Sequence, residues 1–177
     1  MEQLGEQEHM GGITSSVITF ATHRLAEIHR ARATKNENNS WQLDNAVWKN
    51  NDNDLTDTFR PLFNDDVCIT AQLSSYYARR CTKDQTKPLK WSKSIMKVLS
   101  YEYLSKAVNI IMNGAGVQAE NSAASIQNSS IAKIINQNTS KQEVDKASGP
   151  NKGARTVAMH YDMNLNHRLR ERLTNFK

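Results

Sequence analysis

The chain has 177 residues and a net charge of +5, and 38% of its residues are apolar. That apolar fraction is below the roughly 45–50% of ordinary globular domains, although this length can still bury a core without disulfides or a metal. No apolar run approaches the roughly 20 residues that cross a bilayer, so we expect no membrane-spanning segment.

The start of the chain and its cysteines give expectations about the compartment. Residues 1–12 contain three Glu and no base, which is unlike a secretory signal peptide. Cys68 and Cys81 lack the spacing of a metal-binding or redox pair. We therefore expect a cytoplasmic or virion-associated protein with two free thiols.

The first helix is predicted over residues 13–34, after an acidic N-terminal tail. Its apolar positions follow a helical period, and they are Ile13, Val17, Phe20, Leu25 and Ile28. Thr14 or Ser15 is the expected N-cap.

Residues 34–58 are predicted to form a long polar loop, with at most one helical turn near residues 43–48. Trp41 and Trp48 are the large apolar side chains in it. Loops of this length inside a domain are uncommon and are usually functional or bound to a partner. We therefore interpret both tryptophans as protein-interface residues.

Three further helices are predicted between residues 66 and 147. The first starts after Asp65 or Asp66 and ends near Arg80. The second covers residues 88–112 as one continuous helix and stops at the sequence NGAG. The third is a weaker apolar stripe of isoleucines within residues 117–147.

The last part of the chain, residues 147–177, is interpreted as a linker followed by a basic arm that ends in a short helix. Its apolar side chains share one helical face and are assigned to a protein interface: Leu165, Leu169, Leu173 and Phe176. Residues 1–146 would form a helical domain with the acidic tail and the polar loop. The predicted fold class is therefore mainly α, with four to five helices, a long polar loop and an extended C-terminal arm.

Basic residues are concentrated in three segments of the chain. Residues 21–35 have four bases against one acid, residues 79–106 have eight bases against two acids, and residues 152–177 have six bases against two acids. Lysine and arginine neutralise phosphates without needing an exact motif. The residues predicted to contact nucleic acid are Arg79, Arg80, Lys83, Lys87, Lys90, Lys93, Lys97, Arg168, Arg170 and Arg172.

Two simpler interpretations of these features stay open. A lysine-rich helix face is often merely solvated. Aromatic residues lie among the bases, and nucleic-acid bases can stack on such rings. At helical spacing, however, aromatic residues more often belong to a core or an interface.

Catalytic and metal-binding patterns are weak. The acids of residues 36–66 lie in the predicted polar loop, where solvation would keep their pKa values ordinary. His23 and His29 are six residues apart and do not share a helical face. The sequence GPNKGAR lacks the ending of a phosphate-binding loop. We therefore expect no enzymatic activity, no cofactor, no metal site and no small-molecule substrate.

The sequence favours a non-enzymatic structural subunit of a larger assembly, such as a viral coat protein, nucleoprotein, phage connector or ribonucleoprotein subunit. Such a subunit would associate with itself and contact RNA or DNA through basic helix faces. The first alternative is a free-standing dimeric DNA-binding regulator that uses the helices of residues 66–112. The second alternative is a small enzyme without a recognisable motif.

Overall fold

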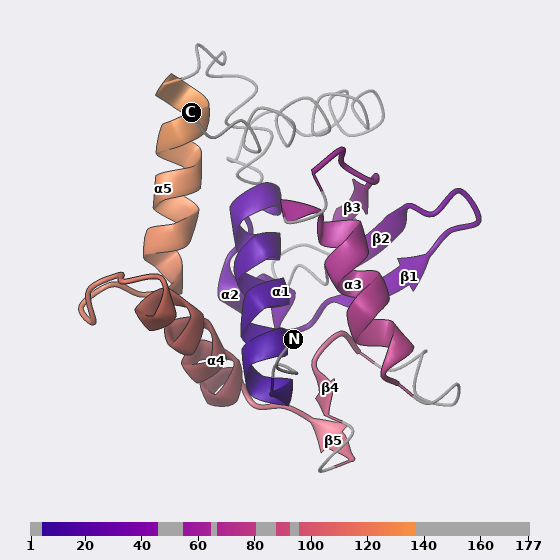
Figure 1. Ribbon diagram of the computed structural model, residues 1–177, viewed down its shortest axis with the longest axis horizontal. Helices are drawn as coiled ribbons and strands as arrows, with labels where there is room; N and C mark the ends of the chain where they lie inside the picture. Colours follow the sequence, from indigo (N-terminus) through magenta and orange to yellow (C-terminus); the bar gives the residue numbers. More distant parts are fainter. Residues whose placement is uncertain (1–4, 46–54, 65–66, 81–87, 93–95, 137–177) are drawn as a thin grey trace.

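The protein is described here by a computed structural model that covers residues 5–45, 55–64, 67–80, 88–92 and 96–136. These parts of the chain form five helices, a three-stranded sheet and a short two-stranded hairpin (Figure 1). The five helices of the described residues lie within the predicted number, but the fold is mixed α/β rather than mainly α. No helix among the described residues is long and apolar enough to cross a membrane. The predicted C-terminal arm lies outside the described residues.

Helix α1 (Glu6–Ala21) is the centre of the fold, with α3 on one side and α4 and α5 on the other (Figure 1). It is apolar on more than one face because it packs against three helices, and Met10, Val17 and Ile18 are fully buried. The Glu8 carboxylate accepts a hydrogen bond from the Gly5 N–H at 2.9 Å, which satisfies a free donor at the helix start. The prediction of an acidic tail over residues 1–12 is therefore wrong, since the helix already begins at Glu6.

The first predicted helix, residues 13–34, is divided into three elements. Helix α1 ends where Thr22 adopts a left-handed conformation with φ of 54°. A single turn, α2 (Leu25–Ile28), follows after the Arg24 N–H donates to the Glu27 carboxylate at 2.7 Å. The chain then enters strand β1 (Arg32–Lys35). The helical period across residues 13–28 thus comes from two helices joined by a bend.

A three-stranded antiparallel sheet occupies most of the described part of the segment that was predicted to be a polar loop. Strands β1, β2 (Trp41–Asn45) and β3 (Leu55–Phe59) lie in sequence order, and Trp41 is paired with Lys35 on one side and Phe59 on the other. Trp41 and Leu43 alternate with polar residues and are buried. The loop prediction failed because the apolar alternation covers only three residues of β2.

Helix α3 (Ile69–Ala78) covers the sheet and confirms the predicted helix that follows Asp66. Trp41 of β2 packs on Tyr77 of α3 with ring centroids 4.7 Å apart, and its indole N–H donates to Ser74 at 3.1 Å. Trp41 is only 3% exposed. It therefore belongs to the core rather than to an exposed interface, whereas Trp48 lies outside the described residues.

The predicted continuous helix over residues 88–112 is wrong in its first half. Strands β4 (Trp91–Ser92) and β5 (Lys97–Val98) form a short hairpin there. Helix α4 (Tyr101–Gly114) begins only after Ser100, whose hydroxyl accepts the Tyr103 N–H at 3.1 Å. The N-cap serine interrupts the apolar stripe of the sequence, and this interruption marks the true helix start.

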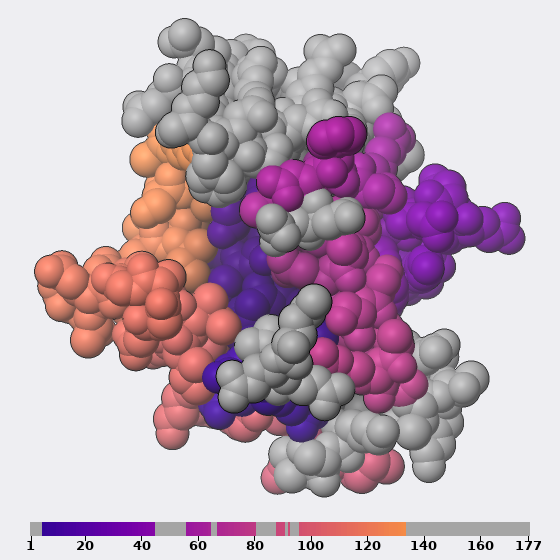
Figure 2. Space-filling model, in the orientation of Figure 1, coloured from indigo at the N-terminus to yellow at the C-terminus, as the bar shows by residue number. Residues whose placement is uncertain are grey.

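Helices α4 and α5 (Ala123–Asn136) pack against α1 from one side (Figure 1). A Cβ atom at Gly11 of α1 would lie 2.2 Å from the carbonyl oxygen of Ala107 in α4, so only glycine allows this approach. Helix α4 stops at Gly114 as predicted, and Gly116 has the left-handed φ of 74°. In the space-filling view, the β1–β2 turn protrudes from one side of the molecule and the α4–α5 connection from the other (Figure 2).

Candidate nucleic-acid interface

Four of the ten residues predicted to contact nucleic acid lie in the described parts of the chain: Arg79, Arg80, Lys90 and Lys97. The other six, which are Lys83, Lys87, Lys93, Arg168, Arg170 and Arg172, lie outside them. So do the predicted interface residues of the C-terminal helix, Leu165, Leu169, Leu173 and Phe176. Arg79 and Lys97 are exposed, whereas Arg80 and Lys90 are buried.

Arg80 is part of the core and not of a solvent-facing surface. Its guanidinium lies 4.6 Å from the ring centroid of Tyr76 and 4.4 Å from that of Tyr77. It donates hydrogen bonds to the Tyr76 hydroxyl at 3.0 Å and to the carbonyls of Pro88 and Leu89. These bonds connect the end of α3 to the turn that precedes β4. Arg80 is thus positioned to stabilise the fold, and this placement does not fit the predicted phosphate contact.

Lys90 belongs to a group of basic side chains that comes from two distant segments of the sequence. The Leu89 N–H donates to the Ala31 carbonyl at 3.1 Å, which joins the end of α2 to the hairpin. His29 donates from Nε2 to the Leu99 carbonyl at 3.2 Å, and the Leu99 N–H donates to the Lys90 carbonyl at 3.0 Å. These contacts bring His29, Arg30 and Lys90 together, and we call the three residues the basic cluster.

The charges of the basic cluster act against one another. Burial lowers the pKa of Lys90, and the charge of Arg30 lowers it further, to about 8. Burial also lowers the pKa of His29, with further lowering by Lys90 and Arg30. The hydrogen bond to Leu99 and the charge of Glu102 oppose this lowering without reversing it. The cluster is therefore a place where an added anion would be favourable.

Exposed apolar side chains lie in the hairpin and at the start of α4, next to the basic cluster. Met96 is 53% exposed, Val98 is 41% exposed and Tyr101 is 44% exposed. The Tyr101 ring makes a T-shaped contact with His29, with centroids 5.9 Å apart. This surface therefore combines apolar and aromatic groups with positive charge.

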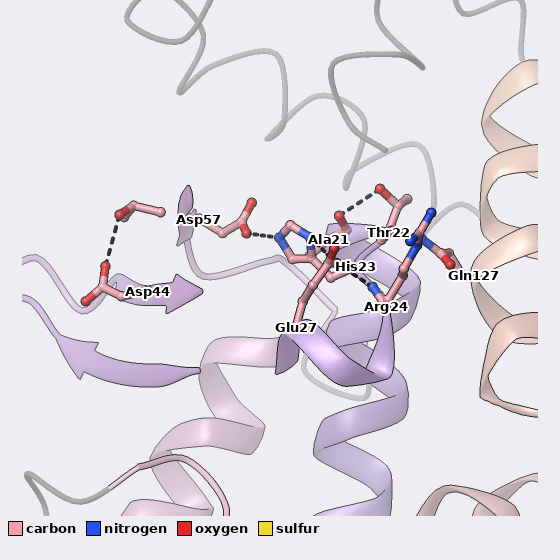
Figure 3. A network of polar contacts seen from close by, with 9 residues as sticks. Ala21, Thr22, His23, Arg24, Glu27, Asp44, Asp57 and Gln127 are labelled. Carbon is pink, nitrogen blue, oxygen red and sulfur yellow. Dashed lines mark hydrogen bonds and ion pairs between the residues drawn. The ribbon is translucent and has the colours of Figure 1, made fainter. Parts of the chain in front are cut away.

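A second polar group is centred on His23, in the bend between α1 and α2 (Figure 3). The imidazole lies between two carboxylates: Nε2 donates to Asp57 of β3, and Nδ1 is 3.4 Å from the Glu27 carboxylate. Burial alone would lower the pKa of His23, but the hydrogen bonds and charges of Asp57 and Glu27 raise it to about 9. His23 is therefore a charged imidazolium at neutral pH.

The His23 group connects several elements of the fold. Asp57 comes from the sheet and Glu27 from α2, while Gln127 of α5 donates to the carbonyl of the neighbouring Thr22 at 2.5 Å (Figure 3). A general base needs an unprotonated nitrogen that can reach a substrate. Because both ring nitrogens of His23 face carboxylates and the residue is only 6% exposed, this arrangement suits a structural clamp.

Cys68 has a thiol, the type of side chain that most readily acts as a nucleophile when it is deprotonated. Burial would raise the pKa of its thiol, but hydrogen bonds from the Leu62 N–H and from Thr70 lower it below its usual value. The side chain is 1% exposed at the N-terminal end of α3. A lowered pKa without access to solvent does not make a reactive thiol. The described residues also contain no group of three or more metal-ligating side chains.

The sequence indicated the basic segments but did not indicate that residues from two of them lie together in the fold. Arg30 belongs to a segment that was recognised as basic, and His29 was considered only for metal binding with His23. Arg30 and Lys90 are 60 positions apart, and no sequence pattern indicates that they are neighbours in the fold. Comparison with known protein families, with curated proteins and with solved structures found no match for this chain.

Proposed function

We propose that this protein is a non-enzymatic subunit of a larger assembly, such as a coat protein, a nucleoprotein or a ribonucleoprotein subunit, and that it holds nucleic acid through its basic surface. The observation that carries the proposal is the convergence of two basic segments at the hairpin. The three residues His29, Arg30 and Lys90 lie together although their charges oppose one another. Beyond the effect of burial, Arg30 lowers the pKa of both His29 and Lys90, and Lys90 lowers the pKa of His29. A phosphate backbone would place additional negative charge beside these groups.

The balance of exposed charges supports a polyanionic partner. Among the described residues, eight bases are exposed: Arg24, Arg30, Arg32, Lys35, Arg60, Arg79, Lys97 and Lys106. Only four acids there are exposed: Glu8, Glu37, Glu102 and Glu120. A surface with twice as many bases as acids attracts nucleic acid from solution and does so less strongly as salt increases.

Exposed apolar side chains support the assembly part of the proposal. Besides Met96, Val98 and Tyr101, the described surface exposes Phe63 fully and leaves Ile110 39% exposed. Single exposed apolar residues are common, but several of them in a chain of low apolar content suit contacts with other subunits.

Two measurements test the function. Affinity for a mixed-sequence RNA or DNA is measured between about 50 and 200 mM salt, where phosphate contacts predict a steep decrease. Sedimentation velocity with and without the nucleic acid then shows whether large particles form. Affinity that does not change with salt would contradict the nucleic-acid part, and a solitary monomer under all conditions would contradict the assembly part.

A compact dimer that binds one duplex sequence would instead favour a DNA-binding regulator. The geometry gives that alternative little support, because α3 and α4 lie on different sides of α1 and the β4–β5 hairpin separates them in the chain (Figure 1). A helix-turn-helix needs two helices that are joined by a short turn and pack on each other.

A further inference from the structure

Tyr101 is an aromatic ring held at the surface beside positive charge. It is the first residue of α4 and 44% exposed. Its T-shaped contact with His29, at an interplanar angle of 72°, restrains the ring without burying it. A restrained, exposed ring is suited to stacking because little side-chain entropy is lost on binding.

The basic residues near this ring come from three elements. His29 and Arg30 follow α2, Lys90 precedes β4 and Lys97 lies in β5. The acid that acts on His29 is Glu102, beside Tyr101, and it is fully exposed at the start of α4. The charges that act on His29 are thus two cations, Lys90 and Arg30, and one carboxylate, and Lys97 adds a further cation in β5.

We propose that Tyr101, Arg30 and Lys90 form a binding site for single-stranded nucleic acid, in which a base stacks on Tyr101, an adjoining phosphate contacts the exposed Arg30, and the buried Lys90 adds positive charge next to Arg30. This inference rests on the proposed function and specifies its ligand. Single strands are favoured over duplex because only an unpaired base presents its face to a ring. Combining a basic groove with stacking rings is the usual way in which proteins hold single strands.

Protonation strengthens the expected phosphate contact. A bound phosphate favours the charged forms of Lys90 and His29, so binding is accompanied by proton uptake. Because the pKa of Lys90 is lowered to about 8, affinity is expected to decrease as the pH rises through that value. Arg30 stays charged over this range and keeps part of the affinity.

Fluorescence anisotropy of the full chain with a labelled single-stranded oligonucleotide, and with a hairpin duplex of the same length, tests the site. Tyr101→Ala is expected to weaken single-strand binding by about 5-fold or more and duplex binding far less, and Tyr101→Phe is expected to retain affinity. Arg30→Glu is expected to weaken binding of the single strand by about 10-fold at low salt and to reduce the salt slope. Arg60→Glu makes the same charge change at an exposed arginine that follows β3, and it should have a clearly smaller effect.

Lys90→Met provides a variant that keeps the packing of the buried side chain. It should weaken single-strand binding and make the remaining affinity less dependent on pH between about 7 and 9, which a purely structural role would not do. Thermal melting of each variant identifies any that fail to fold. Those are replaced by Arg30→Gln or Lys90→Gln.

The outcomes separate this site from the proposed function. If the wild-type chain binds nucleic acid but Tyr101→Ala, Arg30→Glu and Lys90→Met all bind as the wild type does, the site is wrong and the proposed function stands. If Tyr101→Ala weakens single-strand and duplex binding equally, the stacking assignment is wrong. If millimolar inorganic phosphate displaces the oligonucleotide through the same residues, the site takes free phosphate instead. If the wild-type chain binds no nucleic acid at any salt concentration, both proposals fail.

Discussion

His23 and His29 are six residues apart, and the fold places them in opposite electrostatic surroundings. His23 lies between the carboxylates of Asp57 and Glu27, and its pKa is raised to about 9. His29 lies beside Arg30 and Lys90, and its pKa is lowered. The charge of each imidazole therefore depends on a residue from another element, Asp57 for His23 and Lys90 for His29, as well as on its own sequence neighbours.

The two surroundings differ in the sign of the charges that act on the histidine. In the His23 group, an imidazolium meets two carboxylates and holds the sheet to the helices. In the basic cluster, burial and then the charges of Lys90 and Arg30 lower the pKa of His29. A group in which opposite charges meet suits a structural role, whereas a group whose charges repel one another suits the binding of a ligand of opposite sign.

Removing the imidazole of His23 is expected to have the largest effect on stability. His23→Ala leaves Asp57, which is only 8% exposed, without its cation, and the free energy of unfolding should fall by about 3–5 kcal/mol. His29→Ala, the matched control, should cost less than about 1 kcal/mol because it removes only one half-buried ring. Chemical denaturation measures both values. Equal losses would contradict the distinction between the two histidines.

The pH dependence of stability follows from the raised pKa of His23. A histidine whose pKa rises from 6.5 to about 9 on folding contributes stability that is fully present below pH 6.5 and is lost as the pH rises through 9. The free energy of unfolding should therefore decrease by about 3 kcal/mol across this range. The His23→Gln variant should show a much flatter profile, and an equally steep one would exclude His23 as the source.

The close approach of α1 to α4 offers a way to disturb one histidine more than the other. Gly11→Ala places a methyl group against the Ala107 carbonyl and should destabilise the protein by about 1–3 kcal/mol. Because α4 carries Tyr101 and Glu102, the surroundings of His29 should change while the pH profile due to His23 keeps its shape. Gly12→Ala meets no atom within 4 Å and should instead stabilise by about 0.4–1 kcal/mol. Calorimetric melting compares the two variants.

A small effect on stability, and a favourable one, is expected from substitution of Lys90. Lys90→Met removes the cost of burying the ammonium group and its repulsion with Arg30, so the unliganded protein should gain about 1 kcal/mol at pH 7, a modest value because solvent screens part of both effects. The gain should shrink as the pH rises from about 8 to 10.5, where the wild-type lysine loses its charge. Urea denaturation at pH 7 and pH 10 measures it. A loss of stability at pH 7 would indicate that Lys90 supports the fold.

The helices could be predicted from the sequence more reliably than the strands. The apolar periods of α3 and α4 are long enough to recognise, whereas β2 shows only the alternation of Trp41, Gln42 and Leu43. Polar residues on both sides of these three favoured a loop. The start of α4 was signalled by Ser100, but the apolar side chains before it, at Ile95 and Val98, continued the helical period.

The candidate site was predictable only in its charge. The lysines of residues 79–106 indicated a polyanion, but their number did not show which of them are exposed. Arg80 is buried because Tyr76 and Tyr77 of α3 lie four and three residues before it, a spacing that brings their side chains together. Arg30 and Lys90 meet because of the sheet and hairpin between them, which short-range patterns cannot reveal.

The bonds that hold the basic cluster in place include two between backbone atoms, from Leu89 to Ala31 and from Leu99 to Lys90. Bonds of this kind do not depend on which side chain stands at either position. Bases around the hairpin can therefore be exchanged, added or removed by mutation while the framework beneath them persists. A library randomised at Arg30 and Lys97 should yield mostly folded proteins that differ in their ligand preferences. The ligand specificity of this site can therefore evolve without a change of fold.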